Sequence, residues 1–163
     1  MSQKRENKLS HINEEGKASM VNINKKKITK RTAIASAKIF LNDIAYKLVK
    51  KNKSQKGDVL NTSRVAGIMA SKKTSDLIPL CHQINLDKVS IDYVFNNDEK
   101  CIIINSTAVT SSKTGVEMEA LMGATLASLT IYDMLKAVDK KIIITDIMLD
   151  YKDGGRSGKF VRD

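Results

Sequence analysis

The chain has 163 residues and a mass of 18.1 kDa, which is the size of one domain. Hydrophobic residues are 42% and charged residues 28% of the chain, a balance that excludes an intrinsically disordered protein. Two cysteines are too few for a disulfide scaffold, and the absence of a Cys-x-x-Cys pair argues against a zinc ribbon. With no secretory signal or long apolar run, we expect a reduced, cytoplasmic protein without a membrane span.

The formal net charge of +10 is concentrated in two segments. Residues 1–30 carry eight basic and three acidic residues, and residues 47–56 carry five lysines and no acid. Lysines number 23 and arginines only 5, and there is no Trp, which argues against base reading and against a stacking platform for single strands. A polyanionic small molecule such as a nucleoside triphosphate suits such local clusters. A solvated lysine-rich surface is the alternative explanation for residues 1–27.

The polar residues 1–20 are interpreted as a flexible basic arm, followed by a single α+β domain over residues 21–163. Residues 28–41 alternate between small or apolar and polar side chains, which predicts a strand. Helix is the competing interpretation of that segment, because three of the apolar positions are alanines.

Two helices and a rigid connector are predicted next. Residues 42–51 form a short helix capped by Asn42, and residues 57–72 form a second one with Asp58 near its N-terminus. The only proline, Pro79, then marks an irregular connector, because it disfavours helix at the preceding residue.

The second half of the chain predicts a hairpin, a long helix and a closing strand. The hairpin joins Val89–Phe95 to Ile102–Thr110, and the helix spans residues 115–138 before a strand at Ile142–Leu149. This order is the split βαβ plan of ferredoxin-like domains, so we expect an α+β fold with an antiparallel sheet and helices on one face. The buried stripe of the long helix is predicted to have Leu121, Thr125, Ser128, Tyr132 and Leu135 on one face, widened by Met118, Met122, Leu126 and Leu129.

His82, in the connector after Pro79, is the candidate functional histidine, because the other histidine, His11, falls in the arm. Connectors concentrate functional side chains, although a lone histidine near apolar residues is more often structural. Cys81 beside it is interpreted as a small buried residue rather than a nucleophile.

The long helix carries carboxylates at both ends. Glu117 and Glu119 at its start diverge by about 200° on a helix, so at most one is a surface cap and the other is pushed toward a less solvated setting. Near its end, Asp133 and Lys136 are one turn apart within an apolar sequence. This pair is either an exposed salt bridge or a proton donor and acceptor in a partly dry pocket.

The closing segment DGGRSGKF resembles a phosphate-binding loop but lacks the spacing of a P-loop. A flexible terminus is the default interpretation. The alternative is a loop whose backbone N–H groups, with Lys152 and Arg156, surround phosphate.

Three long strings, KGDVLNTSRVAGIMASKKTSDLIPLCH, KTGVEMEALMGATLASLTIYDMLKAVDK and GGRSGKF, resemble in order and spacing the family of cyclic pyranopterin monophosphate synthases. This is the molybdenum cofactor biosynthesis accessory protein C family. The resemblance covers residues 9–160 and implies a ferredoxin-like enzyme that assembles as a hexamer, a trimer of dimers, with active sites at a subunit interface. The implied reaction converts a cyclised dihydro-GTP to the cyclic pyranopterin monophosphate and releases pyrophosphate.

The resemblance also implies roles for individual residues. It places the catalytic acid at Asp133 and the essential lysines at Lys56 and Lys136. Further pocket and substrate-binding positions fall on Leu80, Cys81, His82, Met118, Glu119, Glu117, Arg31, Lys152 and Arg156.

Three residues depart from the family pattern: Asn22 in place of an acid, Gln83 after His82 in place of proline, and Arg156 in place of a lysine. Arg156 keeps the charge that phosphate binding needs. No tightly bound cofactor and no dedicated metal site are expected, although Mg²⁺ can arrive with the substrate phosphates. The runner-up function is a lysine-rich RNA-binding module without catalysis, and a third is an assembly subunit that has lost activity, to which only Asn22 points.

Overall fold

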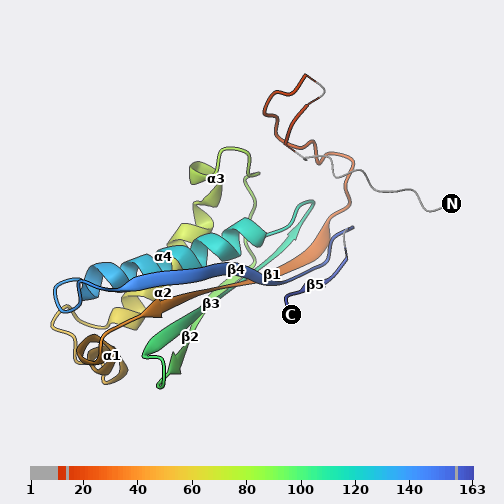
Figure 1. Ribbon diagram of the computed structural model, residues 1–163. Coiled ribbons are helices and arrows are strands. Elements are labelled where there is room, and N and C mark those ends of the chain that lie inside the picture. The colour runs from red at the N-terminus through yellow and green to blue at the C-terminus, as the bar shows by residue number, and fades with distance from the viewer. Residues whose placement is uncertain (1–10, 14, 157) are drawn as a thin grey trace.

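A five-stranded antiparallel sheet lies against two long helices in the computed structural model, which describes residues 11–13, 15–156 and 158–163 (Figure 1). The strand order is β2-β3-β1-β4-β5, and every neighbouring pair is antiparallel. This is the predicted ferredoxin-like plan with one short strand added at the edge. The elements are β1 (Thr29–Phe40), α1 (Asp43–Lys50), α2 (Val59–Lys72), α3 (Thr74–Leu77), β2 (Lys88–Asn96), β3 (Cys101–Ser112), α4 (Glu117–Leu135), β4 (Ile143–Asp153) and β5 (Phe160–Val161).

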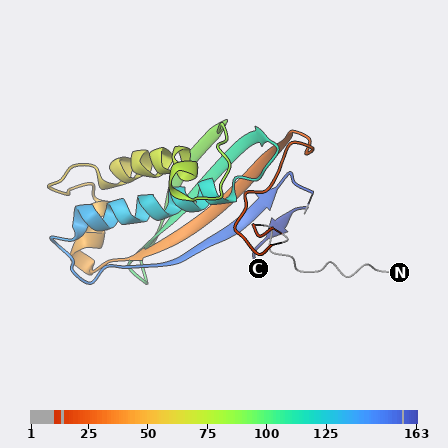
Figure 2. The same ribbon diagram turned by 90° about the horizontal axis from the view of Figure 1, so that it is seen from above.

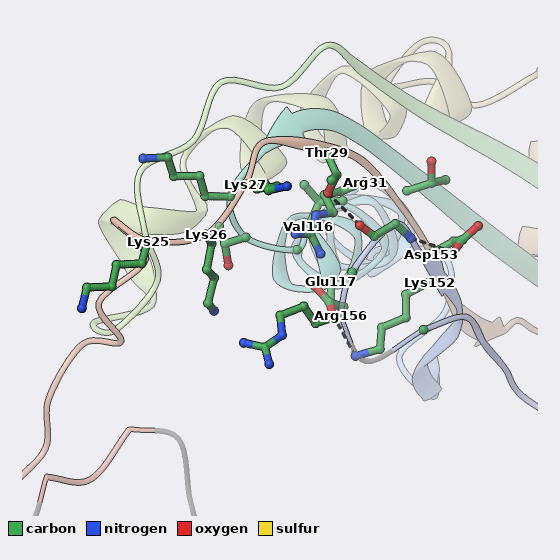
Figure 3. A pocket seen from close by; sticks show the side chains of 17 residues that line it. Lys25, Lys26, Lys27, Thr29, Arg31, Val116, Glu117, Lys152, Asp153 and Arg156 are labelled. Atoms are coloured by element: carbon green, nitrogen blue, oxygen red, sulfur yellow. Dashed lines mark hydrogen bonds and ion pairs between the residues drawn. The ribbon is translucent and has the colours of Figure 1, made fainter.

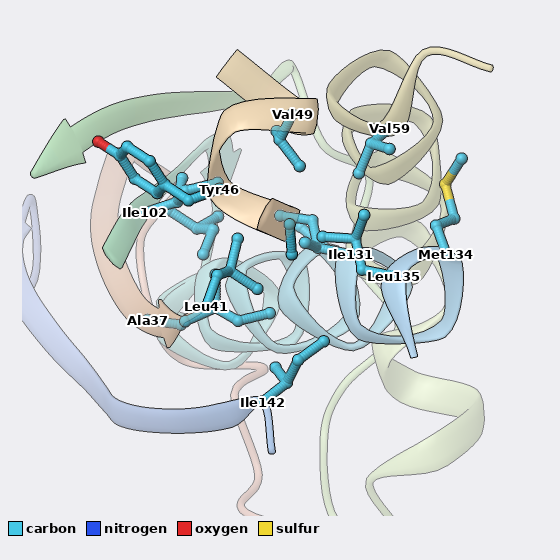
Figure 4. Close-up of a cluster of buried hydrophobic side chains, with 14 of the residues drawn as sticks. Ala37, Leu41, Tyr46, Val49, Val59, Ile102, Ile131, Met134, Leu135 and Ile142 are labelled. Carbon is cyan, nitrogen blue, oxygen red and sulfur yellow. The ribbon is translucent and has the colours of Figure 1, made fainter. Parts of the chain in front are cut away.

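The alternation of β1 determines which side of the sheet is covered. Ala33, Ala35, Ala37 and Ile39 are fully buried against the helices, which confirms the strand prediction for this segment. Small side chains on this face let α4 approach the central strand closely. Ile102 and Ile104 of β3 complete the sheet side of the core, which packs against Ile131 and Leu135 of α4 (Figure 4).

The face that α4 turns to the sheet differs from the prediction. Its buried residues at the centre of the helix are small, and include Ala120, Gly123, Ala124 and Ala127. Leu129, predicted to be in the buried stripe, is 50% exposed. The prediction was right for Ser128 and Leu135, which are buried, but it left out the alanines and the glycine that close helix packing requires here. A Cβ on Gly67 of α2 would lie 2.7 Å from the backbone oxygen of Gly123.

The N-terminal caps that the sequence predicted for the first two helices are present in the structure. The Asn42 side chain accepts a 2.8 Å hydrogen bond from the backbone N–H of Ala45, and Asp58 accepts one of 2.9 Å from Asn61. Ile78, before Pro79, is extended as expected and ends the short helix α3, which was not predicted.

The aromatic residues of β2 do not face solvent on the open side of the sheet. Tyr93 and Phe95 pack against the core beneath the helices. The Tyr93 hydroxyl lies 2.5 Å from Ser63 Oγ of α2, and the Arg64 guanidinium lies over the Tyr93 ring. Tyr93 and Phe95 are therefore unavailable for base stacking, which argues against the RNA-binding alternative.

The two ends of α4 lie in different surroundings. Its N-terminal end faces the arm and the β4–β5 end of the sheet, whereas its C-terminal end lies beside α1 (Figures 1 and 2). Of the predicted arm, residues 1–10 and Glu14 lie outside the described residues, and a single bridge joins Ile12 to Ala18. No helix of the described part of the chain is long and apolar enough to cross a membrane.

Candidate active site

A cavity of about 720 Å³ opens at the N-terminal end of α4 (Figure 3). Its walls come from the segment before β1, the start of β1, the loop that precedes α4, and the end of β4 with the loop that follows it. We call it the large cavity. Its lining residues are Lys25, Lys26, Lys27, Thr29, Arg31, Thr32, Lys113, Thr114, Gly115, Val116, Glu117, Lys152, Asp153, Gly154, Gly155, Arg156 and Gly158.

The large cavity is strongly cationic. Seven lysine and arginine side chains line it, against the two carboxylates of Glu117 and Asp153. It also lies at the N-terminus of α4, where unpaired backbone N–H groups favour an anion. Such a concentration of positive charge fits a ligand with several negative charges, and the volume fits a nucleotide.

Arg31 and Lys152 lie on neighbouring strands at the base of this cavity. The Nε of Arg31 is buried and has no hydrogen-bond partner among the described residues, so the guanidinium has a donor available for a ligand oxygen. Lys152 Nζ lies 3.1 Å from Glu117 Oε1, and both side chains are about one-third exposed. The two cations thus form the inner wall of the large cavity (Figure 3).

The glycine-rich segment is held in a loop between two paired strands. Phe160 of β5 pairs with Lys152 of β4, and the backbone N–H of Arg162 donates to the oxygen of Asp150 at 2.8 Å. The loop brings Arg156 to the large cavity. This arrangement favours the ordered phosphate-loop alternative over a flexible terminus, although Ser157 lies outside the described residues.

A second, smaller cavity of about 240 Å³ adjoins the first, and we call it the small cavity. It joins the two segments that the resemblance assigned to the substrate, Leu80–His82 and Met118–Glu119. Its lining residues are His11, Leu80, Cys81, His82, Thr114, Gly115, Glu117, Met118 and Glu119.

Glu119 is the buried carboxylate of the small cavity. It is 4% exposed, and this burial raises the pKa of its carboxyl from 4.5 to about 7, with a further contribution from the negative charge of Glu117. The expectation that one of the two glutamates is poorly solvated is confirmed, and it is the one that has no cationic partner among the described residues. A carboxyl with a pKa near neutrality can both donate and accept a proton.

Cys81 and His82 differ in their contacts. Burial, followed by the negative charge of Glu119, raises the pKa of the Cys81 thiol, so this cysteine is a poor nucleophile. A ring nitrogen of His82 lies 2.7 Å from the backbone oxygen of Val21. His82 therefore ties the connector to the segment that carries Lys25, Lys26 and Lys27.

The three residues predicted to be catalytic meet at the opposite end of α4. Lys136 Nζ lies 2.7 Å from Asp133 Oδ1, and Lys56 Nζ donates to the backbone oxygen of Asp133 at 3.1 Å. The hydrogen bond and charge of Lys136 lower the pKa of Asp133, with a smaller contribution from the charge of Lys56. We call these residues the Asp133 cluster.

The Asp133 cluster is on the surface of the single chain, which favours the exposed salt bridge over the partly dry pocket, the two alternatives that the sequence left open. The side chains of Asp133 and Lys136 are 64% and 56% exposed. Asp133 follows Glu117 by sixteen positions of α4, which correspond to about 24 Å along the helix axis. The predicted catalytic and substrate-binding residues therefore form two groups at opposite ends of one chain.

Sequence reasoning missed part of the large cavity. Lys25, Lys26 and Lys27 were assigned to a solvated surface, because a run of lysines has no periodicity that shows which side chains face a cavity. Lys113, in the loop before α4, was not among the predicted site residues. The lysine run next to a strand that carries Arg31 was the available signal.

Neither cavity contains an evident metal site. Across the described ranges, no three His, Cys, Asp or Glu side chains lie together as ligands of one ion. The large cavity instead offers cations, which suit phosphate oxygens directly.

The chain is similar in sequence to known proteins over nearly its whole length. The chain is 50% identical over 159 residues to the cyclic pyranopterin monophosphate synthase of Staphylococcus aureus, covering 94% of this chain and 96% of that protein. It is 48% identical over 155 residues to the synthase of Campylobacter jejuni subsp. doylei, covering 95% and 99%. The synthase of Staphylococcus haemolyticus is 48% identical over 158 residues, with the same coverage. The model of the MoaC family matches residues 20–155. This range includes the Asp133 cluster and the α4 residues that line the two cavities. The chain therefore belongs to the MoaC family.

Proposed function

We propose that this protein is a cyclic pyranopterin monophosphate synthase of molybdenum cofactor biosynthesis. It would convert a cyclised dihydro-GTP, 3',8-cyclo-7,8-dihydro-GTP, to the cyclic pyranopterin monophosphate and release pyrophosphate, which makes it a lyase. The observation that carries the proposal is the cationic large cavity beside the buried Glu119, because the reaction needs a triphosphate held next to groups that transfer protons. Membership of the MoaC family supports it.

In this proposal the triphosphate occupies the large cavity. Arg31 has a free Nε, Lys152 lies at the cavity wall, and Arg156 reaches it from the β4–β5 loop. Arginine binds phosphate through two parallel hydrogen bonds, so Arg31 and Arg156 would fix the orientation of the phosphates. Any Mg²⁺ would be carried by the phosphates, and the absence of a resident cofactor stays a prediction.

The base and sugar part of the substrate would lie toward the small cavity. Leu80 and Met118 offer apolar contacts there, and His82 and Glu119 offer polar ones. Opening and re-closing the rings requires protons to move at carbon, nitrogen and oxygen atoms, and Glu119 is the described carboxyl of this cavity that titrates near neutral pH.

The Asp133 cluster would act from a neighbouring chain. A distance of about 24 Å along α4 is too long for one nucleotide to contact both groups within a single chain. We propose a homohexamer, a trimer of dimers in the cytoplasm, in which the cluster of one chain completes the cavities of another. In support, Val65 and Met69 on α2 and Leu129 on α4 are all at least half exposed, an apolar surface that a second chain would cover.

The proposal is tested by incubating the purified protein with the cyclised GTP intermediate. Pyrophosphate and, after oxidation, a fluorescent pterin are expected in equal amounts. The Lys152→Ala variant should lose most of this activity, whereas Glu99→Gln, an exposed carboxylate on the β2–β3 turn, should keep it. Absence of both products with the folded parent protein would reject the proposal. Salt-sensitive retention of RNA in the same preparation would favour the binding-module alternative.

A further inference from the structure

Glu117 stands between the two cavities. It lines both of them, together with Thr114 and Gly115. On the side of the large cavity its carboxylate pairs with Lys152 at 3.1 Å. A Cβ on Gly115 would overlap with this carboxylate, so the glycine provides the space in which Glu117 folds back over the start of α4. The carboxylate of Glu117 is therefore the group of the small cavity that is most directly exposed to a change of charge in the large cavity.

Glu119 faces the small cavity with few charged neighbours. Glu117 approaches it from the same helix, Cys81 and His82 from the connector, and His11 from the arm. From α2, the uncharged Ser71 hydroxyl donates to the backbone oxygen of Glu119 at 2.8 Å. No lysine or arginine is among the described residues that line this cavity, so nothing of fixed positive charge holds Glu119 ionised.

We propose that binding of a polyphosphate in the large cavity causes Glu119 to take up a proton. Two effects act in the same direction. The phosphate brings negative charge to the other side of Glu117, and its oxygens compete with Glu117 for the ammonium of Lys152. Both leave more uncompensated negative charge beside Glu119 and make its ionised form less favourable.

This inference rests on the proposed function, because it requires phosphate in the large cavity, and it adds a consequence for the reaction. The small cavity would hold a proton donor when the triphosphate is in place, and Glu119 would return its proton to solvent once pyrophosphate leaves. The coupling is reciprocal, so protonation of Glu119 also strengthens phosphate binding.

Isothermal titration calorimetry with inorganic pyrophosphate tests the inference without any turnover. Titrations at pH 7 in two buffers of different ionisation enthalpy give the number of protons taken up on binding. Because the pKa of Glu119 is about 7, the parent protein should take up about half a proton more per site than Glu119→Gln. The difference between the two proteins removes the protons of pyrophosphate itself and of the histidines. Glu99→Gln is the matched control and should behave like the parent.

Equal proton uptake by the parent and by Glu119→Gln, with pyrophosphate bound to both, would overturn the inference and leave the phosphate site standing. Failure of the parent to bind pyrophosphate would overturn the inference together with the phosphate assignment. If Glu119→Gln does not fold, difference infrared spectroscopy of the parent with isotope-labelled glutamate decides. Pyrophosphate should then increase the signal of protonated glutamate, and an unchanged signal would refute the coupling.

Discussion

The hydroxyl of Thr29, the first residue of β1, donates a 2.7 Å hydrogen bond to the backbone oxygen of Gly154, which directly follows β4. This contact crosses 125 positions of sequence and fixes the loop that presents Arg156 to the large cavity. Gly154 has a φ of +96°, and a Cβ at this position would overlap with the backbone oxygen of Lys30. The crossing of these two segments therefore requires glycine.

Gly154→Ala should displace the phosphate loop. Because the added methyl group meets backbone rather than a flexible side chain, we expect the Michaelis constant for the cyclised substrate to rise about 10- to 100-fold. Gly158→Ala is the matched control, because Gly158 has a φ of +76° in the same loop but open space around a Cβ. Steady-state kinetics on both variants distinguish displacement from backbone strain. Equal effects of the two substitutions would contradict the role given to the Thr29 contact.

Arg156→Ala should weaken substrate binding more than it slows the bound reaction. A charge-assisted hydrogen bond to phosphate is lost, so the Michaelis constant should rise about 10- to 100-fold while kcat changes little. Lys159→Ala is the control, because Lys159 lies over the Tyr151 ring at 5.3 Å and does not line the large cavity. An unchanged Michaelis constant for Arg156→Ala would remove this residue from the phosphate site.

The sequence predicted local structure better than it predicted the long-range arrangement. Alternation identified β1, and the caps at Asn42 and Asp58 identified two helix starts, because both signals act within a few residues. The buried face of α4 was predicted only in part, because alanine and glycine carry no strong hydrophobic signal although they allow the closest packing. The β4–β5 pairing was missed for a similar reason, since a two-residue strand has no periodicity.

The candidate site shows the same difference between local and long-range prediction. Leu80, Cys81 and His82 meet Glu119 in one cavity, as the resemblance implied, and Lys56 meets Asp133. The sequence analysis did not recognise that these are two separate places. The spacing along the predicted helix contained that information, because sixteen positions of α-helix extend about 24 Å.

Glu119→Gln should change stability in a pH-dependent way. The folded state holds the Glu119 proton more tightly than the unfolded state, so stability of the parent falls as pH rises from about 4.5 to about 7 and then stays low. The shift of the Glu119 pKa from 4.5 to about 7 corresponds to about 3 kcal/mol of folding stability. The parent loses this stability as pH rises, and the Gln variant does not. Urea unfolding at a fixed protein concentration should show the variant more stable than the parent at pH 8, and the advantage should shrink toward pH 5. A constant difference at both pH values would contradict a raised pKa.

Asp133→Asn should slow turnover strongly while leaving the fold intact. Loss of a general acid–base group costs on the order of 10²- to 10⁴-fold in rate. Asp146→Asn is the matched control, because it breaks a comparable 3.0 Å ion pair with Lys38, and Asn suits the φ of 52° at that position. Single-turnover rates and melting temperatures are measured for both variants. If Asp133→Asn turns over within threefold of the parent, the pair with Lys136 is only a surface salt bridge.

Co-assembly of two inactive variants tests whether the site is shared between chains. If the Asp133 cluster of one chain completes the cavities of another, a dimer of Asp133→Asn with Glu119→Gln contains one site with both changes and one site with neither. Random pairing of equal amounts should then restore about a quarter of the parent activity, because half of the dimers are mixed and each mixed dimer has one intact site. The variants are co-expressed with different tags, and light scattering confirms that each assembles like the parent, at six times the 18.1 kDa chain mass. If each chain forms its own complete site, every site in the mixture carries one substitution and no activity returns. A mixed assembly without activity would therefore refute the shared site, and a monomer at micromolar concentration would refute the hexamer.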